Sequence, residues 1–164
     1  MDAIVLELPK IPGECSLKGY EKKIELNSID SAVSMPMTGS ATNTERTSGS
    51  AVIEDIRLTK YVDISSALIY QACCEATIQG TAKLTIARND SGNILPLLVF
   101  ELEDVLIASA SLSCSKEGGI PLENVTLNFT KITWTYSLQK EGQGKAGEVI
   151  GSWDASLNQA SRND

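Results

Sequence analysis

One stretch of the chain matches a cofactor-binding motif letter by letter. Residues 142–147, G-Q-G-K-A-G, fit the pattern G-x-G-x-x-G of dinucleotide-binding proteins. Such a site needs a strand before the motif and a helix after it, because the pyrophosphate sits at the N-terminus of that helix. The residues that follow, E-V-I-G-S-W-D, do not form a helix of useful length. We therefore interpret the motif as a flexible connection.

Side chains that could catalyse a reaction lack the partners they need. The chain contains no histidine, the usual acid–base group near neutral pH. The carboxylates of Glu54-Asp55 and of Glu101-x-Glu103-Asp104 include neighbours that would point to opposite faces of a strand. The serines have no histidine partner and no G-x-S-x-G motif. We expect no catalytic residues and interpret these carboxylates as surface charge.

The cysteines do not predict a metal site or a disulfide scaffold. Cys15, Cys73, Cys74 and Cys114 include no C-x-x-C pair, and their spacing matches no small secreted framework. Zinc sites usually need such a pair or histidines. We expect buried free thiols, no metal ion and no other cofactor.

Length and charge narrow the possible partners and location. The chain has 164 residues, which suit a single domain over residues 1–164. Its net charge of −7 argues against nucleic acid as a partner. No apolar run is long enough to insert into a membrane, and the N-terminal residues lack the basic segment of a signal peptide. We expect a protein made in the cytoplasm that leaves it only through a dedicated machine.

The longest periodic segment lies at residues 121–138. Val125, Leu127 and Phe129 share one face, the phase then slips by one residue, and Ile132 and Trp134 continue the apolar face towards Tyr136 and Leu138. A period of two broken by one extra residue is typical of a long, bulged antiparallel strand. Shorter alternating segments predict further strands at residues 4–8, 22–35, 52–61, 83–88, 94–101 and 104–113. Pro96 places the strand at 94–101 at a sheet edge or at a bulge.

Two other segments interrupt this β pattern. Asp63 or Ser65 can cap a short helix that runs to Cys74. Its apolar stripe lies at Ile64, Leu68 and Ala72 and is widened by Ala67, Ile69 and Cys73. Residues 37–50 are small and polar, so we predict an extended loop. Residues 158–164 resemble a flexible tail. The fold class is therefore mainly β: a two-sheet antiparallel β-barrel or sandwich with one short α-helix.

These features favour a structural or interaction protein over an enzyme. A small β-sandwich that binds a ligand, such as a carbohydrate, remains the alternative. Trp134 or Trp153 would line its groove, although burial in the core or at a subunit contact is the commoner position for an aromatic on a strand.

Several local sequences, taken together and in order, resemble the hemolysin-coregulated protein family of the bacterial type VI secretion system. They are G-E-C at 13–15, D-I-R-L-T-K-Y-V-D at 55–63, A-C-C at 72–74, A-K-L-T-I at 82–86, L-E-D-V-L-I-A-S-A-S at 102–111 and E-N-V-T-L-N-F at 123–129. The resemblance covers nearly the whole chain.

The resemblance implies a β-barrel subunit of the secretion system's inner tube. It implies homohexameric rings that stack into a tube, a contractile sheath that drives the tube outward, a spike protein at its tip, and small effectors bound in the lumen of some members. It also implies secretion into the medium or into target cells without a signal peptide.

Three sets of site residues follow as hypotheses. The first set would mediate ring stacking from the extended loop: Thr38, Asn43, Thr44, Glu45, Arg46 and Thr47. The second set would contact neighbouring subunits: Leu68, Leu95, Leu97, Val99 and Trp134. The third set would face the lumen: Glu25, Asn27 and Asp30.

Overall fold

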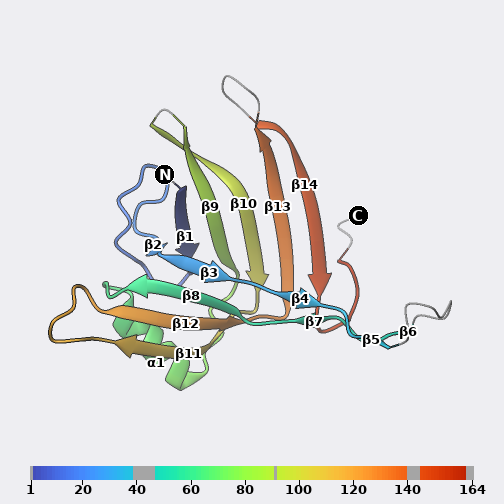
Figure 1. Ribbon diagram of the computed structural model, residues 1–164, viewed down its shortest axis with the longest axis horizontal. Helices are drawn as coiled ribbons and strands as arrows, with labels where there is room; N and C mark the ends of the chain where they lie inside the picture. Colours follow the sequence, from blue (N-terminus) through green and yellow to red (C-terminus); the bar gives the residue numbers. More distant parts are fainter. Residues whose placement is uncertain (1, 39–46, 91, 140–144, 162–164) are drawn as a thin grey trace.

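The described part of the chain forms two antiparallel β-sheets, one α-helix and a projecting two-stranded ribbon (Figure 1). The structure is a computed structural model and describes residues 2–38, 47–90, 92–139 and 145–161. The six-stranded sheet has the order β14-β13-β10-β9-β1-β2. Its strands are β1 (Asp2–Glu7), β2 (Ile24–Leu26), β9 (Ala82–Asp90), β10 (Asn93–Glu103), β13 (Lys131–Gln139) and β14 (Lys145–Asp154).

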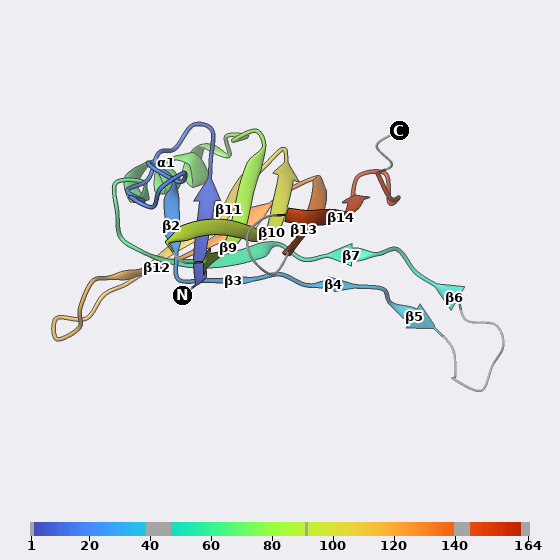
Figure 2. The same cartoon turned by 90° about the horizontal axis from the view of Figure 1, so that it is seen from above.

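The four-stranded sheet has the order β11-β12-β8-β3. Its strands are β3 (Ser28–Asp30), β8 (Ile56–Tyr61), β11 (Leu106–Ser113) and β12 (Leu122–Asn128). The ribbon is the projection in which β4 (Val33–Ser34) pairs with β7 (Val52–Ile53) and β5 (Met37–Thr38) pairs with β6 (Thr47–Ser48). The helix α1 (Ser66–Glu75) lies beside the four-stranded sheet, and the ribbon and the β11–β12 hairpin project from opposite ends of the molecule (Figure 2). These elements confirm the mainly β class with one short helix.

The core lies between the two sheets and is built from matching strand faces. In the six-stranded sheet, Ile24, Leu6, Leu84, Phe100 and Trp134 form one cross-strand row. All but Trp134, which is half-buried, are buried. Burying a side chain of this size stabilises the fold by about 2 kcal/mol.

The facing row of the four-stranded sheet is also apolar. Leu58 pairs with Ile29 on one side and with Val125 on the other, and Val125 pairs with Ala110. The alternation seen in the sequence therefore reflects one face in the core and one face outside.

The predicted long strand at residues 121–138 is wrong in one respect. The structure forms two strands there, and they belong to different sheets: β12 lies in the four-stranded sheet and β13 in the six-stranded sheet. The slipped phase falls at Phe129 and Thr130, where the Thr130 N–H donates a hydrogen bond to the Glu103 carbonyl at 3.1 Å. The slip marks the crossing from one sheet to the other, because the chain must turn its apolar face to stay in the core.

The predicted strand at residues 22–35 breaks for the same reason. It divides into β2 in the six-stranded sheet, β3 in the four-stranded sheet and β4 in the ribbon. Between β2 and β3, the Asn27 N–H already donates a hydrogen bond to the Thr59 carbonyl of β8 at 2.8 Å.

The strand that contains Pro96 lies inside a sheet. β10 pairs with β9 on one side and with β13 on the other, so the edge position predicted as one alternative is wrong. The alternative prediction of a bulge is confirmed, because the pairing register with β9 shifts between Pro96 and Leu98. The bulge lets a residue without an N–H remain in a central strand.

The helix begins and ends close to the prediction, and its predicted apolar stripe is buried only in part. Ser66, Ile69 and Ala72 are buried, whereas Ile64 and Leu68 are 57% and 42% exposed. The helix is oriented with Ser66 towards the interior because the Ser66 hydroxyl donates a hydrogen bond to the buried Glu123 carboxylate. At its C-terminus, Ala76 adopts a left-handed φ of 50° and its N–H donates to the carbonyls of Ala72 and Cys73.

The glycine-rich C-terminal region contains a strand that the sequence did not predict. Residues 145–147 of the G-x-G-x-x-G motif open β14, which pairs with β13 over its length. Residues 142–144 lie outside the described residues. Further on, the Asp154 N–H donates a hydrogen bond to the Gln159 carbonyl at 2.9 Å, so part of the predicted tail returns to β14.

Candidate assembly surfaces

The described carboxylates do not converge on a reactive site. Among the described residues, no three His, Cys, Asp or Glu side chains cluster in a way that could hold a metal ion. Glu103 forms an ion pair with Lys131 at 3.3 Å, and Asp55 accepts a hydrogen bond from the Asn128 amide at 2.8 Å. These carboxylates support neighbouring strands.

The four cysteines are free thiols in different environments. Cys15 is buried, and burial raises the pKa of its thiol. Cys74 and Cys114 are exposed and Cys73 is half-buried, so the prediction of buried thiols holds for Cys15 alone.

A buried polar cluster joins the four-stranded sheet to the helix. The Lys60 ammonium lies 2.7 Å from a Glu123 oxygen and 2.9 Å from an Asp63 oxygen, and it donates to the Tyr61 carbonyl at 2.8 Å. The Ser66 hydroxyl donates to the same Glu123 oxygen at 2.8 Å. Lys60 and Glu123 are only 1% and 2% exposed. Each buried charge therefore has an opposite charge and further hydrogen-bond partners.

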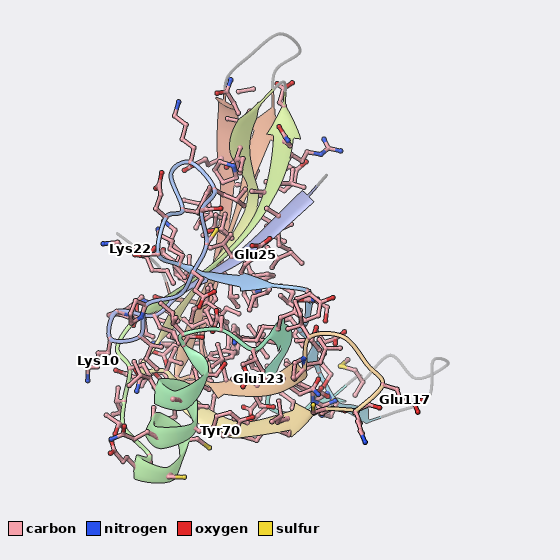
Figure 3. The ribbon with its side chains drawn as sticks, turned by 90° about the vertical axis from the view of Figure 1, so that its left-hand side faces the viewer. Lys10, Lys22, Glu25, Tyr70, Glu117 and Glu123 are labelled. Carbon is pink, nitrogen blue, oxygen red and sulfur yellow. The ribbon has the colours of Figure 1, made fainter. Side chains whose placement is uncertain are left out.

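The cluster fixes the start of the helix against β8 and β12. Figure 3 views the molecule from the side of the β11–β12 hairpin and shows Glu123 on its strand above Tyr70 on the helix. Burial, together with the negative charge of Glu123, raises the pKa of Tyr70. The cluster therefore has a structural role: it sets the position of the chain between Tyr61 and Ser66.

An uncovered apolar surface lies at the open edge of the six-stranded sheet. Strand β14 forms this edge over ten residues, whereas the opposite edge, β2, has three. Tyr136 and Val149 pair across β13 and β14 and are 43% and 60% exposed. A long apolar edge strand is prone to pair with another chain. We define the edge surface as Tyr136, Leu138 and Val149, which share one face of the sheet.

A second apolar surface lies on the ribbon. We define the ribbon-end surface as Val33, Met35, Met37 and Val52, which are between 43% and 57% exposed. Val33 and Met35 also line a cleft together with Ala51, Ile53, Trp134 and Trp153. A carbohydrate site needs several polar groups to fix the sugar. This cleft is also lined by Ser34, whose hydroxyl is the one polar group there besides the two indole N–H groups. The cleft therefore does not favour the carbohydrate alternative.

A third apolar surface lies at the opposite end, around the base of the β11–β12 hairpin. We define the hairpin-end surface as Tyr61, Val62, Ile64, Ile120 and Leu122, which are between 40% and 65% exposed. Tyr61, Val62 and Ile120 line one cleft with Glu14, Glu25 and Asn27. Apolar side chains therefore form the rim of a concave site at this end.

The structure spreads the predicted subunit-contact residues over several surfaces. Leu68 lies on the exposed side of the helix. Trp134 packs against the core, and Val99 lines a cleft on the outer face of the six-stranded sheet. Leu95 lines a neighbouring cleft and Leu97 is half-buried. They do not form one patch, and their role stays a prediction.

The predicted lumen residues are divided as well. Glu25 and Asn27 line the hairpin-end cleft, whereas Asp30 lies on β3 opposite Arg57 of β8. All three are exposed.

The predicted stacking residues fall only partly within the described part of the chain. Asn43, Thr44, Glu45 and Arg46 lie outside the described residues. Thr38 and Thr47 are backbone partners in the ribbon, so residues that were predicted to form an extended loop begin as a paired β-ribbon.

Sequence reasoning missed the edge surface. It assigned Tyr136 and Leu138 to the apolar face that continues from Ile132, and it did not recognise β14 as a strand. The alternation of Val149, Gly151 and Trp153 could have revealed that strand.

Comparison with solved structures identifies the class of fold as that of type VI secretion proteins. "Structure of a type six secretion system protein" superimposes with a TM-score of 0.91 at 20% identity, covering 98% of this chain and 100% of the other. Hcp1 from Salmonella typhimurium gives a TM-score of 0.80 at 21% identity over 98% and 99% of the two chains. At these identities the likeness concerns the fold.

Sequence comparison then gives the family. The family described as "Type VI secretion system effector, Hcp" matches residues 5–136. Protein hcp1 of Pseudomonas aeruginosa is 34% identical to this chain over 107 residues. The match covers 65% of this chain and 66% of the relative, so the chain spans just under two thirds of the relative's length. The chain belongs to the Hcp family of the type VI secretion system.

Among the described residues, no helix is long and apolar enough to cross a membrane.

Proposed function

We propose that the chain is a structural, non-enzymatic subunit of the type VI secretion tube, folded as a single domain over residues 1–164. Copies assemble into six-membered rings, and rings stack into a tube that passes out of the cell with the sheath, the spike protein and small effectors as partners. Family membership supports this proposal, and so does the structure of the sheet edge.

The observation that carries the proposal is the edge surface. A monomer would leave the ten-residue edge of β14 and the apolar side chains of Tyr136 and Val149 in water. A ring joins two different surfaces of each subunit and closes on itself, so no such edge stays open. The same contact buries apolar area, which drives association.

Ring formation is tested by light scattering on the size-exclusion peak, with negative-stain images of the same fraction. We expect a mass near six chains and open rings. The double variant Tyr136→Lys/Val149→Lys should give a folded monomer, because two charges would have to lose their water in the contact. The matched control Ile78→Lys/Leu157→Lys places the same charges on exposed apolar residues outside the predicted contact surfaces and should still form rings. A wild-type monomer at high concentration would overturn the proposal.

The loop and the lumen have separate tests. Deleting residues 38–48 should leave rings but abolish tubes, and unchanged tube formation would reject a role of the loop in stacking.

Asp30→Lys should alter secretion or cargo retention if Asp30 faces the lumen. Unaltered secretion and cargo retention would remove that assignment.

A further inference from the structure

We propose that a charged trough on the outer face of the six-stranded sheet binds an extended peptide segment of another protein, one that carries both a basic and an acidic side chain. We define the charged trough by Lys18, Lys23, Lys83, Glu101 and Glu148, which line one cleft of about 510 Å³. This role goes beyond the proposed tube function, because ring formation does not use this cleft.

The charged trough and the edge surface lie on opposite faces of the same strands. On β13, Thr135 and Ser137 line the trough and alternate with Tyr136 and Leu138 of the edge surface. A ring contact through the edge surface therefore leaves the trough open. The three predicted lumen residues are not among the residues that line it, so its ligand differs from a cargo held in the lumen.

Charges of opposite sign lie at opposite ends of the trough. Lys18 comes from the loop before β2 and Lys83 from β9, whereas Glu148 comes from β14 at the open edge of the sheet. Strand β9 is three strands away from β14, which is about 14 Å at the usual strand spacing. A ligand with charges of one sign is attracted at one end and repelled at the other, whereas a dipolar ligand is attracted at both.

Part of this charge has no partner inside the protein. Among the described residues, Lys18, Lys83 and Glu101 form no ion pair. Lys23 differs, because its ammonium pairs with the Glu7 carboxylate and so ties the loop to β1. Two ammonium groups and one carboxylate of the trough are therefore available to a ligand.

The floor of the trough suits a peptide backbone. Hydroxyl groups of Thr85, Thr135 and Ser137 line it, and a hydroxyl both donates and accepts, as the C=O and N–H groups of a peptide require. Pro96 and Val99 lie among these hydroxyls. Their apolar surfaces can contact the methylene groups of long charged side chains.

The trough continues into a second cleft, which favours an extended ligand over a compact one. Lys18, Gly19 and Ile94 line both the trough and a neighbouring cleft of about 350 Å³. An extended segment can pass from one cleft into the other along the loop, whereas a compact ligand would fill the first cleft alone.

The loop between the two clefts is ordered before anything binds. The Gly19 N–H donates hydrogen bonds to both oxygens of the Glu21 carboxylate at 3.0 Å. At the base of the loop, the Cys15 N–H donates to the Lys23 carbonyl and the Lys22 N–H donates to the Cys15 carbonyl, both at 2.9 Å. A wall that is already fixed loses little freedom when a ligand binds.

Saturation-transfer difference NMR with three peptides, each acetylated and amidated, tests the site. K-A-S-A-E is dipolar, and its two charged side chains lie on one face of an extended chain about 14 Å apart. K-A-S-A-K and E-A-S-A-E carry charges of one sign. We expect the dipolar peptide to bind the wild-type protein about fivefold more tightly than either of the others. Equal dissociation constants for the three peptides would overturn the inference.

Charge reversal should switch this preference. Lys18→Glu/Lys83→Glu should bind K-A-S-A-K best, because both ends of the trough are then acidic. Glu101→Lys/Glu148→Lys should bind E-A-S-A-E best, because both ends are then basic. A variant that is folded by circular dichroism and still prefers the dipolar peptide would contradict the site.

Two further sets of variants serve as controls. Lys10→Glu/Lys116→Glu changes the net charge as much as the first reversal, on exposed residues outside the trough, and should keep the dipolar preference. A switch in this control would overturn the inference, since net charge alone would then explain the effect. If a reversed variant does not fold, Lys83→Gln and Glu101→Gln should each weaken the dipolar peptide about threefold, and unchanged binding by both would overturn the site.

A longer peptide tests whether the ligand is a segment. K-A-S-A-E-A-S-A reaches the second cleft beyond the basic end of the trough and should bind more tightly than K-A-S-A-E. Equal affinity would overturn the assignment to an extended segment and leave a site for short dipolar molecules. Because peptide binding is measured apart from association, absence of rings would defeat the proposed function and not this inference.

Discussion

The two halves of β13 share one pattern and have opposite environments. On one face of the strand, Ile132 is fully buried and Trp134 is half-buried, while Tyr136 and Leu138 are 43% and 44% exposed. The four-stranded sheet covers the first half and leaves the second half open. The comparison teaches that an apolar strand face can form part of the core at one end and an exposed surface at the other, without any change of residue type.

The largest expected effect comes from leaving a charge unpaired in the covered region. Lys60→Met would leave the buried Glu123 carboxylate without its partner, and we expect the free energy of unfolding to fall by about 3–5 kcal/mol. The double variant Lys60→Met/Glu123→Leu should recover most of that loss. Urea denaturation measures both, and a double variant as unstable as the single one would contradict the compensation between the two charges.

The next effect comes from a cavity in the covered half of β13. Ile132→Ala removes a fully buried side chain, so we expect a loss of about 2–5 kcal/mol in the free energy of unfolding. Urea denaturation measures this loss as well. Ring formation by the variant is compared with that of the wild type at a temperature at which the variant is folded. A loss below about 1 kcal/mol would show that this half of the strand is not part of the core.

The smallest effect on stability comes from the open half. Leu138→Ala should change the unfolding free energy of the dissociated chain by no more than about 0.5 kcal/mol, because its side chain is already in contact with water. Ring assembly should weaken nonetheless, measured as a higher concentration for half-association. A large loss of stability with unchanged assembly would reverse the comparison.

Alternation predicted the kind of elements but could not assign them to sheets. The phase slip at Phe129 and Thr130 was visible in the sequence, yet a bulge and a change of sheet leave the same trace. Only the pairing of β12 with β8 and of β13 with β10 separates them, and those partners are distant in sequence.

The helix shows a second limit. Its extent and the burial of Ala72 were predictable from spacing, but the burial of Ser66 was not, because the Ser66 hydroxyl donates a hydrogen bond to Glu123, a residue 57 positions away. A pattern based on apolar residues alone cannot anticipate a buried polar partner. The candidate surfaces were unpredictable for a similar reason: Tyr136 and Leu138 have the composition of a core, and their exposure depends on how far the second sheet reaches.

The direction of β8 has a mechanical consequence. The chain runs from the ribbon through β7 directly into β8, which ends at the hairpin-end surface and is bonded along its length to β12. A load applied between the two ends of the molecule therefore acts along this strand. Such a load shears the β8–β12 pairing as a whole, so the hydrogen bonds between these two strands share the load instead of opening one after another. A strand paired in this way can carry a load along the molecule while the fold stays intact.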